Sequence, residues 1–410
     1  MDFYMEIEIL RGKEHIGGNI IKVTEGSTSI LLDCGEALPP VGQPYVEDDF
    51  DMRCIGPMDA VFLSHHHGDH SGLLERLPAE TALYASEATI HFMNTVDSYL
   101  DRPLRTGSRS VYPLTDLQTV LVGELSIKSI AVEHSADGAM MFLIGGRDKR
   151  ILYTGDFKEA DGLPIDGVDL LITEGTMLTR DDQAYADEDA VEQALRQLLQ
   201  DTKGRVFVLQ SSANLPRIRS VMNARNAISP VALSARPIMQ DVFLKFTLEQ
   251  TGHGELAAPY AFVWNGFDKN GSRAYDRIVR EFCDYDAATS YKRIADFRNA
   301  IVFIRPTMLK MFQQLIHDGM DISRDALVFS QWRGYEAEPK TAALLNLFAR
   351  HGVQPTYIHT SGHADKRAIG TLIAHIKPKK IACVHSEDAN AIAMLVPQDT
   401  QIVQGDVISL

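Results

Sequence analysis

Short runs of apolar residues, each bounded by Gly, Asp, Ser or Pro, follow one another through the first 175 residues of the chain. Runs of this length and composition are typical of buried or half-buried β-strands. Helix-like segments such as residues 87–100 lie between some of them. This part of the chain therefore predicts a strand-rich unit, with strands at residues 5–10, 29–33, 60–64, 140–144, 151–155 and 169–173.

After Glu174 the pattern changes. Residues 188–202 have apolar positions at helical spacing and an acidic start, which favours a helix N-terminus. Strand-like and helix-like segments then alternate to about residue 350, beginning with residues 205–209, 214–226, 230–234 and 238–250. Such alternation is typical of parallel βαβ units.

The end of the chain predicts a strand at 355–359, helices near 364–376 and 388–396, a strand at 380–385, and final strands. An α/β domain at about 186–349 would therefore be inserted into a first domain formed by residues 1–185 and 350–410.

Length and composition agree with a globular protein of more than one domain, since 45% of the 410 residues are hydrophobic. No apolar run approaches the roughly 20 residues that span a bilayer, and residues 1–15 do not resemble a signal peptide. These observations predict a cytoplasmic protein without membrane contact. The cysteines are far apart and form no CxxC pair, so they indicate neither a thiolate zinc site nor a disulfide framework: Cys34, Cys54, Cys283 and Cys383.

The formal net charge of −15 argues against a protein that coats nucleic acid nonspecifically, because phosphate binding relies on Lys and Arg. It leaves room for a local basic groove. An acidic chain can also hold two divalent cations, which reverse the sign of the local charge.

The segment HHHGDH directly follows the predicted strand 60–64 and contains the pattern H-x-H-x-D-H at His65, His67, Asp69 and His70. A strand that ends in four such donors can place them around two adjacent metal ions. Imidazole and carboxylate are suitable zinc ligands, and a site without cysteine retains a reactive bound water. The alternative is a chance or tag-like run of histidines, but this pattern arises by chance in roughly one sequence in a thousand. His66 is not assigned to the metal.

Three further donors end apolar runs elsewhere in the chain: His134, Asp156 and His385. A strand end is where side chains project into a site. Any one of them alone would more often be an ordinary turn residue, but beside HHHGDH we expect all three to be ligands.

These residues resemble those of the metallo-β-lactamase superfamily, whose fold is an αββα sandwich of two mixed sheets. The resemblance implies that Asp33 in LLDCGE orients the site and that Asp156 bridges two Zn²⁺ ions, with Mn²⁺ as an alternative. The implied ligands are His65, His67 and His134 for the first zinc, and Asp69, His70 and His385 for the second.

Glu174 in TEGT, His363 in HTSGHA and His385 in VHSED match three extra motifs of the β-CASP nucleases, which carry an inserted α/β domain. The sequences of these three motifs are most similar to those of the ribonuclease J family, and they are also similar to those of the enzyme that cleaves pre-mRNA at its 3′ end. HIGGNIIKV, TGDF and SSANLPRIRS extend the likeness to essentially the whole chain. A His at the last motif is associated with enzymes that act on RNA. Ser386 departs from the family, which commonly has Gly there, and ribonuclease J usually continues into a dimerising C-terminal domain, so the sequence does not reveal a homo-oligomer.

The resemblance implies a zinc-dependent ribonuclease that acts on single-stranded RNA through a hydroxide activated by two metals. It also implies 5′-to-3′ exonuclease action together with endonuclease activity. Asp69, Glu174 and His363 are the implied catalytic residues. His363 would protonate the leaving ribose oxygen, while Glu174 would hold His363 and raise its pKa.

The segment before the predicted helix 364–376 offers hydroxyl and amide groups that could cradle an RNA phosphate, because a helix N-terminus favours anions. In ribonuclease J this loop helps to recognise a 5′-monophosphate. The expected phosphate-binding residues are His359, Ser361, Gly362 and Ala364. The alternative is a simple Gly-containing turn with a capping Ser.

Two other pairs of residues leave alternatives open. Arg217 and Arg219 would contact the RNA backbone or lie on a solvated helix face. Trp332 and Tyr335 would stack on bases or pack in a core.

Three other functions compete with the ribonuclease. A thioesterase or lactonase of the same superfamily would need only the metal motif, and Glu174 and His363 argue against it. A DNA nuclease of the same family is the second. A non-catalytic relative is the third, although every expected ligand position is filled.

Overall fold

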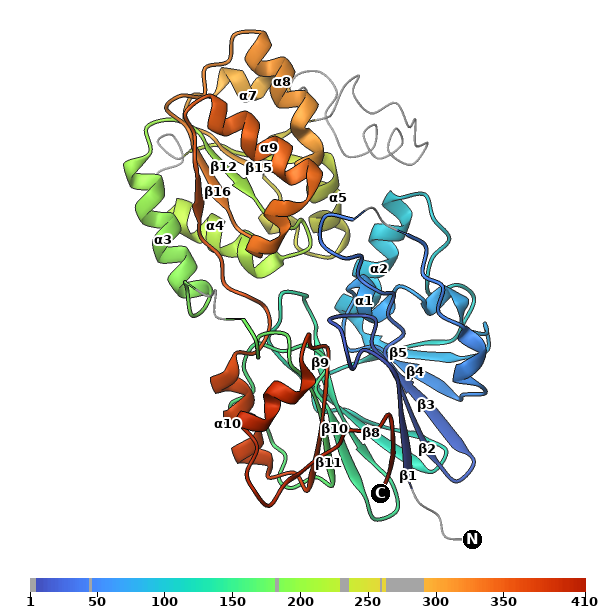
Figure 1. Ribbon diagram of the computed structural model, residues 1–410. Coiled ribbons are helices and arrows are strands. Elements are labelled where there is room, and N and C mark those ends of the chain that lie inside the picture. Colours follow the sequence, from blue (N-terminus) through green and yellow to red (C-terminus); the bar gives the residue numbers. More distant parts are fainter. Residues whose placement is uncertain (1–4, 44–45, 181–183, 229–235, 259, 263–290) are drawn as a thin grey trace.

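The structure, a computed structural model, describes residues 5–43, 46–180, 184–228, 236–258, 260–262 and 291–410. Cys283 and the expected strand at 230–234 lie outside the described residues. The chain forms two lobes, and two chain segments connect them (Figure 1).

One lobe contains two sheets, each seven-stranded among the described residues. The first sheet has the order β20 (Val407–Ser409), β1 (Met5–Arg11), β2 (Ile20–Glu25), β3 (Thr28–Leu32), β4 (Ala60–Phe62), β5 (Ala82–Ser86), β6 (Val111–Leu114). The second has the order β19 (Gln401–Ile402), β18 (Lys380–Val384), β11 (Leu170–Glu174), β10 (Arg150–Tyr153), β9 (Met140–Gly145), β8 (Leu125–Ala131), β7 (Thr119–Val122).

The two sheets pack face to face around a core that includes Ile7, Phe62, Phe142 and Ile172. Helix α2 (Glu87–Tyr99) covers the outer face of the first sheet, and α10 (Lys366–Ile376) covers that of the second. Both sheets mix parallel and antiparallel pairs. The predicted αββα sandwich is confirmed.

The burial of individual strands explains why the sequence forms them. β1 alternates buried and half-buried residues, as expected for a strand with one face on the core. β11 is buried at every position because it lies inside the second sheet, with the core on one face and helix α10 on the other. β11 ends at Glu174, one of the predicted catalytic residues.

The other lobe contains a sheet that is six-stranded among the described residues and parallel throughout those pairs. Its order is β14 (Tyr260–Phe262), β13 (Ile238–Asp241), β15 (Ile301–Ile304), β12 (Val206–Leu209), β16 (Ala326–Phe329), β17 (Pro355–Tyr357). Helices cover both of its faces, as parallel sheets require. They are α3 (Glu188–Asp201), α4 (Leu215–Ile228) and α5 (Val242–Gln250) on one face, and α8 (Leu309–His317) and α9 (Pro339–Arg350) on the other, with the short α7 (Arg293–Asp296) beside them. The predicted parallel βαβ units are confirmed.

Two expectations about this lobe were wrong in detail. Residues 238–250 were expected to form one helix, but the first four form β13, and the Asp241 carboxylate caps α5 by accepting from Leu244 N. Residues 355–359 were assigned to the first domain, but β17 pairs with β16, so the inserted sheet extends beyond residue 349. A short apolar or polar run does not show which sheet it will join, so the remaining domain boundaries stay a prediction.

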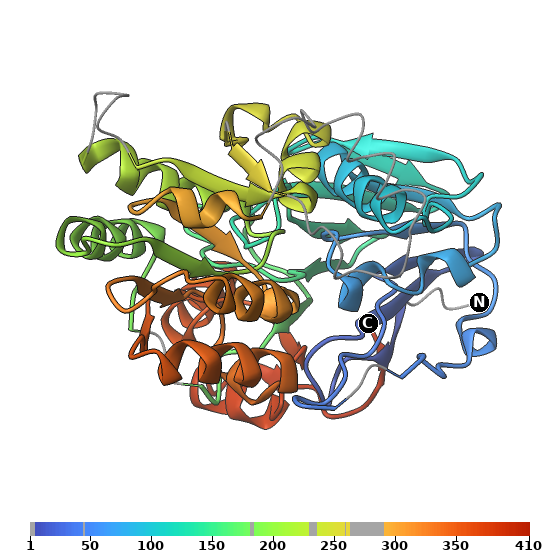
Figure 2. The same cartoon turned by 90° about the horizontal axis from the view of Figure 1, so that it is seen from above.

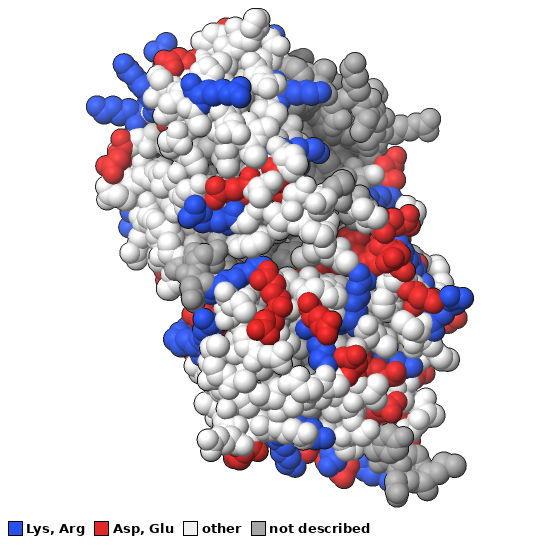
Figure 3. Space-filling model, viewed as in Figure 1, with Lys and Arg blue, Asp and Glu red and all other residues white. Residues whose placement is uncertain are grey.

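The parallel strands of the inserted lobe all point their carboxyl ends toward the first lobe, because β17 leads directly into the segment that returns there. Seen from above, the insertion lies mainly over one side of the sandwich, beside the blue and cyan residues of the first sheet (Figure 2). Lys and Arg are interspersed with Asp and Glu over the described residues of the face drawn in Figure 3. Among the described residues, no helix has the length and apolar character needed to cross a membrane.

Candidate metal centre

The histidine-rich segment begins where β4 ends. His67 is the N-cap of the short helix α1 (Gly68–Ser71), and this helix contains Asp69 and His70. The Ser71 hydroxyl lies 3.0 Å from the carbonyl oxygens of His66 and of His67 and fixes the loop to the helix. A buried strand and a one-turn helix therefore hold the predicted donors in place.

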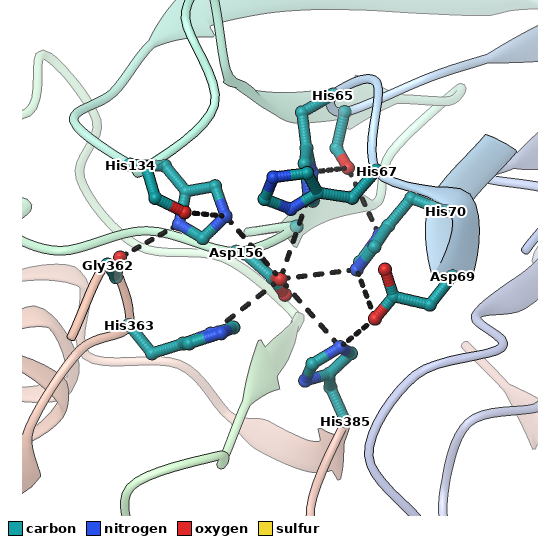
Figure 4. A network of polar contacts seen from close by, with 12 residues as sticks. His65, His67, Asp69, His70, His134, Asp156, Gly362, His363 and His385 are labelled. Atoms are coloured by element: carbon teal, nitrogen blue, oxygen red, sulfur yellow. Dashed lines mark hydrogen bonds and ion pairs between the residues drawn. The ribbon is translucent and has the colours of Figure 1, made fainter. Parts of the chain in front are cut away.

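The predicted ligands of the two metals form two compact groups (Figure 4). In each group the donor atoms all lie within 4.8 Å of one another. The groups are His65, His67 and His134, and Asp69, His70 and His385. They coincide with the two ligand sets that the resemblance implied, and their role as ligands stays a prediction.

Asp156 lies between the two groups. Its Oδ2 atom is 3.7 Å from His65 Nε2 and 3.9 Å from His134 Nε2, both in the first group. The same oxygen is 3.2 Å from His70 Nε2 and 3.7 Å from His385 Nε2, both in the second. This central position is the one that a bridging carboxylate needs.

Burial keeps most of the imidazoles neutral. It lowers the pKa of His65 and of His134 well below the ordinary value, and the pKa of His67 to about 4. Neutral imidazole is the form that binds a metal ion, so these side chains are ready to act as ligands at neutral pH.

His70 behaves differently because carboxylates surround it. Burial would lower the pKa of His70, but the charges of Asp156 and Asp33 outweigh burial and raise the pKa well above its ordinary value. His70 Nε2 and Asp156 Oδ1 are buried without a hydrogen-bond partner. Buried polar atoms without a hydrogen-bond partner are expected where a divalent cation binds. The surrounding imidazole nitrogens and carboxylate oxygens are suitable ligands for zinc.

A buried network orients His70. The carboxylate of Asp33, the predicted orienting residue, lies 2.7 Å from His70 Nδ1 and accepts hydrogen bonds from Ser64 and from Tyr153 Oη at 2.6 Å. Asp33 has a φ of 59°, a conformation that Asp tolerates better than most residues. Sequence analysis missed Tyr153, because it is part of an apolar strand with no polar signature.

Two other orienting contacts were also missed. Thr176 Oγ1 lies 2.7 Å from His385 Nδ1, and the Gly362 carbonyl lies 2.8 Å from His134 Nδ1. Each leaves the other ring nitrogen to face the cluster, as partners of metal-binding histidines do. The only hint in the sequence was that both residues belong to the motifs around Glu174 and His363.

Glu174 and His363 lie against this cluster. Glu174 ends β11, is fully buried, and accepts from Phe157 N at 3.0 Å and from His363 Nδ1 at 2.9 Å. His363 follows β17, and its side chain is 22% exposed. Burial would lower the pKa of His363, but Glu174 and then Asp156 raise it to about 9, so the imidazole is protonated at neutral pH.

Donor atoms of Asp156, Glu174, His363 and His385 also lie within 4.8 Å of one another and could in principle hold a cation. The 2.9 Å contact between His363 Nδ1 and Glu174 favours a proton there instead. The arrangement thus combines a cluster that could hold divalent cations with a protonated imidazole beside it.

Comparison with known proteins identifies this arrangement. A family profile described as "Beta-lactamase superfamily domain" matches residues 28–209, and one described as "Zn-dependent metallo-hydrolase RNA specificity domain" matches residues 354–402. The first range holds the donors from His65 to Glu174, and the second holds His363 and His385. These two ranges of the chain are similar to domains of the metallo-β-lactamase superfamily.

Curated relatives named Ribonuclease J align with most of the chain. The Corynebacterium glutamicum protein is 22% identical over 93% of this chain, the Helicobacter pylori protein 24% over 93%, and the Sinorhizobium meliloti protein 23% over 89%. These alignments cover 54%, 56% and 65% of the relatives, so the chain spans little more than half of their length. The predicted resemblance to β-CASP, ribonuclease J-like proteins is confirmed.

A solved structure shows the same fold. "Crystal Structure of a Protein of Unknown Function from Enterococcus faecalis V583" superposes with a TM-score of 0.76 at 20% identity. The superposition covers 99% of this chain and 100% of that chain. The metallo-β-lactamase fold with its insertion is therefore shared over the full length of both chains.

The predicted phosphate-binding loop is less open than its sequence suggested. His363 N donates to Ser361 Oγ, Ala364 N donates to Glu174, and Gly362 O faces His134. Burial, and next Arg217 and Lys158, lower the pKa of His359 to about 3, so this imidazole is neutral. The Asp365 side chain caps the following helix. Phosphate binding by this loop stays a prediction that relies chiefly on the Ser361 hydroxyl.

Arg217 has a different role from the expected contact with RNA. It is completely buried, with its guanidinium on Glu188 at 2.7 Å, on Ser330 Oγ at 2.6 Å and on Thr360 O at 3.1 Å. The expectation that it contacts the RNA backbone was wrong, because its guanidinium is buried and paired with Glu188. Arg219 is exposed and lies near His253.

Two remaining expectations concern residues without a site role. His66 is buried and stacks on Phe92 with ring centroids 3.9 Å apart, which agrees with leaving it out of the ligand set. Cys34, Cys54 and Cys383 are free thiols, as expected.

Proposed function

We propose that the chain is a metal-dependent ribonuclease that hydrolyses phosphodiester bonds of single-stranded RNA. The Glu174–His363 pair beside the donor cluster carries this proposal. A thioesterase or lactonase would need only the cluster, whereas an ester of phosphoric acid with a ribose leaving group needs a proton donor. The relatives named Ribonuclease J and the RNA specificity profile support RNA as the substrate.

His363 supplies the proton. Glu174 holds its Nδ1–H, so Nε2–H is free to donate toward the partly exposed side. When the phosphorus–oxygen bond breaks, this proton passes to the leaving ribose oxygen, and the phosphate stays on the 5′ carbon of the next nucleotide. The pKa of about 9 keeps the donor charged at neutral pH and close to the range in which proton transfer is efficient.

Two zinc ions, with manganese as an alternative, are the proposed cofactors. When bound, they would supply an activated water as the nucleophile and neutralise charge on the scissile phosphate. The residues that would hold these cations are His65, His67, Asp69, His70, His134, Asp156 and His385. Asp33, Thr176 and Gly362 keep three of these imidazoles in orientation, and Tyr153 donates to Asp33.

The proposed activity includes both 5′-to-3′ exonuclease and endonuclease cleavage of RNA. Ser361 Oγ accepts from His363 N, so its own hydrogen is available to a terminal phosphate. This contact favours RNA with a 5′-monophosphate.

The test uses purified protein loaded with Zn²⁺ or Mn²⁺ and a labelled single-stranded RNA that carries a 5′-monophosphate, a 5′-triphosphate or a 5′-hydroxyl. We expect cleavage that leaves 5′-phosphate ends and is fastest on the monophosphate. DNA of the same sequence, a thioester and a lactone serve as competing substrates. Hydrolysis of the thioester or lactone without cleavage of RNA would overturn the proposal, and faster cleavage of DNA would replace RNA as the substrate.

A further inference from the structure

A pair of aromatic residues lies where the two lobes meet. Trp332 and Tyr335 follow β16, whose carboxyl end neighbours that of β17, the strand that leads to His363. Tyr335 belongs to the 3-10 helix η5 (Arg333–Ala337). A Cβ atom added to Gly42 of the first lobe would lie 3.5 Å from the Ala337 carbonyl, so η5 reaches that lobe.

Trp332 is fixed rather than free. The Arg180 guanidinium lies over its ring, 4.1 Å from the ring centroid, and Arg180 also forms an ion pair with Glu387, two residues beyond His385. The ring folds back on Gly334, where an added Cβ would lie 2.2 Å from the indole. The expectation that Trp332 itself stacks on a base is therefore less favoured than a supporting role.

Tyr335 is the aromatic residue that remains available. It is 39% exposed, although a large apolar ring is normally buried when it serves only the core. Its ring stands nearly perpendicular to that of Trp332, at 83° with centroids 5.5 Å apart. Its neighbour Trp332 contacts Arg180, whose ion-pair partner Glu387 lies two residues beyond His385, so the ring stands close to a predicted metal ligand.

We infer that Tyr335 is a stacking platform for one nucleobase of the RNA strand close to the scissile phosphate, with Trp332 and Arg180 as its support. This inference rests on the proposed ribonuclease function. Stacking on an aromatic ring accepts every base, because each base has a π face, and it suits a single strand. The Arg180 charge beside the platform favours the neighbouring phosphate.

The experiment compares Tyr335→Ala and Tyr335→Phe with a matched control, Tyr112→Ala. Tyr112 is a similarly exposed tyrosine, but it lies on β6 at the edge of the first sheet. Cleavage is measured on a short single-stranded RNA and on a series in which each nucleotide in turn is abasic. Binding of the same RNAs is measured in EDTA by fluorescence anisotropy, so that affinity is known without turnover.

For the intact RNA we expect Tyr335→Ala to weaken binding and raise KM by about 5-fold to 150-fold, the range that stacking contributes per base. Tyr335→Phe and Tyr112→Ala should remain within about twofold of the wild type, because the phenyl ring preserves the π face. One abasic position should weaken the wild type and leave Tyr335→Ala unaffected.

Two results would overturn the inference: unchanged RNA binding in Tyr335→Ala, or an equal loss on intact RNA and on every abasic RNA. A wild type that binds RNA through Tyr335 but cleaves none would instead refute the proposed function and leave the platform standing. Melting temperatures equal to that of the wild type show that the Tyr335 variants fold.

Discussion

The Glu174 carboxylate, 2.9 Å from His363 Nδ1, determines at which pH the proposed acid holds its proton. With a pKa of about 9, His363 is protonated at neutral pH and loses its proton as the pH rises through 9. We therefore predict that kcat/KM for RNA declines on the alkaline side near pH 9. In Glu174→Gln the supporting charge is lost, so the decline should move to lower pH, which a pH–rate profile measures.

The matched variant is His363→Ala. It should lose the alkaline decline and about 10²–10⁴-fold in kcat, while elemental analysis finds unchanged metal content. An alkaline limb that stays in place in Glu174→Gln, or survives in His363→Ala, would contradict the assignment of the acid.

At the residue scale, a functional residue can be predicted from the sequence when both its type and its spacing from other such residues indicate a chemical role. HHHGDH met that condition, and so did Asp33 within its motif. Tyr153 did not, because an apolar strand conceals it until the fold brings it 2.6 Å from Asp33, 120 positions away. The prediction for Arg217 was wrong because its position on a helix is compatible with either an exposed or a buried side chain. Only the packing of the inserted lobe shows that it is buried.

The contact between α1 and the loop after β3 positions the donors at the scale of elements. An added Cβ at Gly35 would lie 1.7 Å from the Asp69 carbonyl oxygen, a backbone atom that cannot turn away. We predict that Gly35→Ala displaces α1, lowers Zn²⁺ affinity, and destabilises the protein by about 1–3 kcal/mol, as overpacking does. Urea unfolding and zinc titration measure the two effects.

Gly370→Ala is the control for that substitution. Gly370 lies within helix α10, and an added Cβ there meets nothing within 4 Å. It should stabilise the protein by about 0.5–1 kcal/mol, since Ala favours a helix interior over Gly. Equal behaviour of the two variants would show that close packing at Gly35 does not hold α1.

Elements with a clear period were predictable, and short ones were not. Helix α3 carries buried Val191, Leu195 and Leu199 at helical spacing, and the structure forms it within one residue of the expected bounds. β17 has three residues, none of them fully buried, so nothing in its sequence indicates which sheet it completes. The pairing with β16 comes from the chain's path between the lobes, which local patterns do not encode.

At the scale of the whole molecule, Arg217 connects the two chain segments that join the lobes. It binds Glu188 where the chain has entered the insertion and Thr360 where it leaves. Removing one partner of a buried pair leaves an uncompensated charge, so we predict that Arg217→Ala costs about 3–5 kcal/mol in unfolding free energy. RNA cleavage should fall with it, because His363 follows Thr360 by three residues.

Arg219→Ala is the natural comparison, since that exposed neighbour should change stability by less than about 0.5 kcal/mol. Denaturant unfolding and RNA cleavage assays measure both variants. Comparable stability of the two would mean that the buried network does not couple the lobes.

Bound cations would join parts of the chain that are far apart in sequence, from His65 after β4 to His385 beyond the insertion. Zn²⁺ should therefore raise the melting temperature of the whole protein. At a hundredfold excess of Zn²⁺ over Kd, the free energy of unfolding should increase by about 2.7 kcal/mol. The sign of the pH dependence follows from His70. Its raised pKa means that the protonated pair with Asp156 and Asp33 stabilises the metal-free protein at low pH and is lost as the pH rises through that raised value. Zn²⁺ must displace this proton, so the zinc-dependent rise should be larger at pH 8 than at pH 6.

Thermal unfolding with Zn²⁺ and with EDTA at both pH values tests this prediction. His67→Ala should lose most of the zinc-dependent rise, because it removes one donor of the first group. His91→Ala should keep the rise, since His91 is an exposed residue of α2, paired only loosely with Glu87 at 4.0 Å. If the rise were equal at pH 6 and pH 8, zinc would not compete with the proton on His70, and the ion would have to bind elsewhere. The donors follow strands of both sheets, so zinc should stabilise the protein as a whole. A zinc-dependent rise in melting temperature that appeared in only one of several unfolding transitions, and did not depend on pH, would show that zinc binding is not coupled to the whole fold.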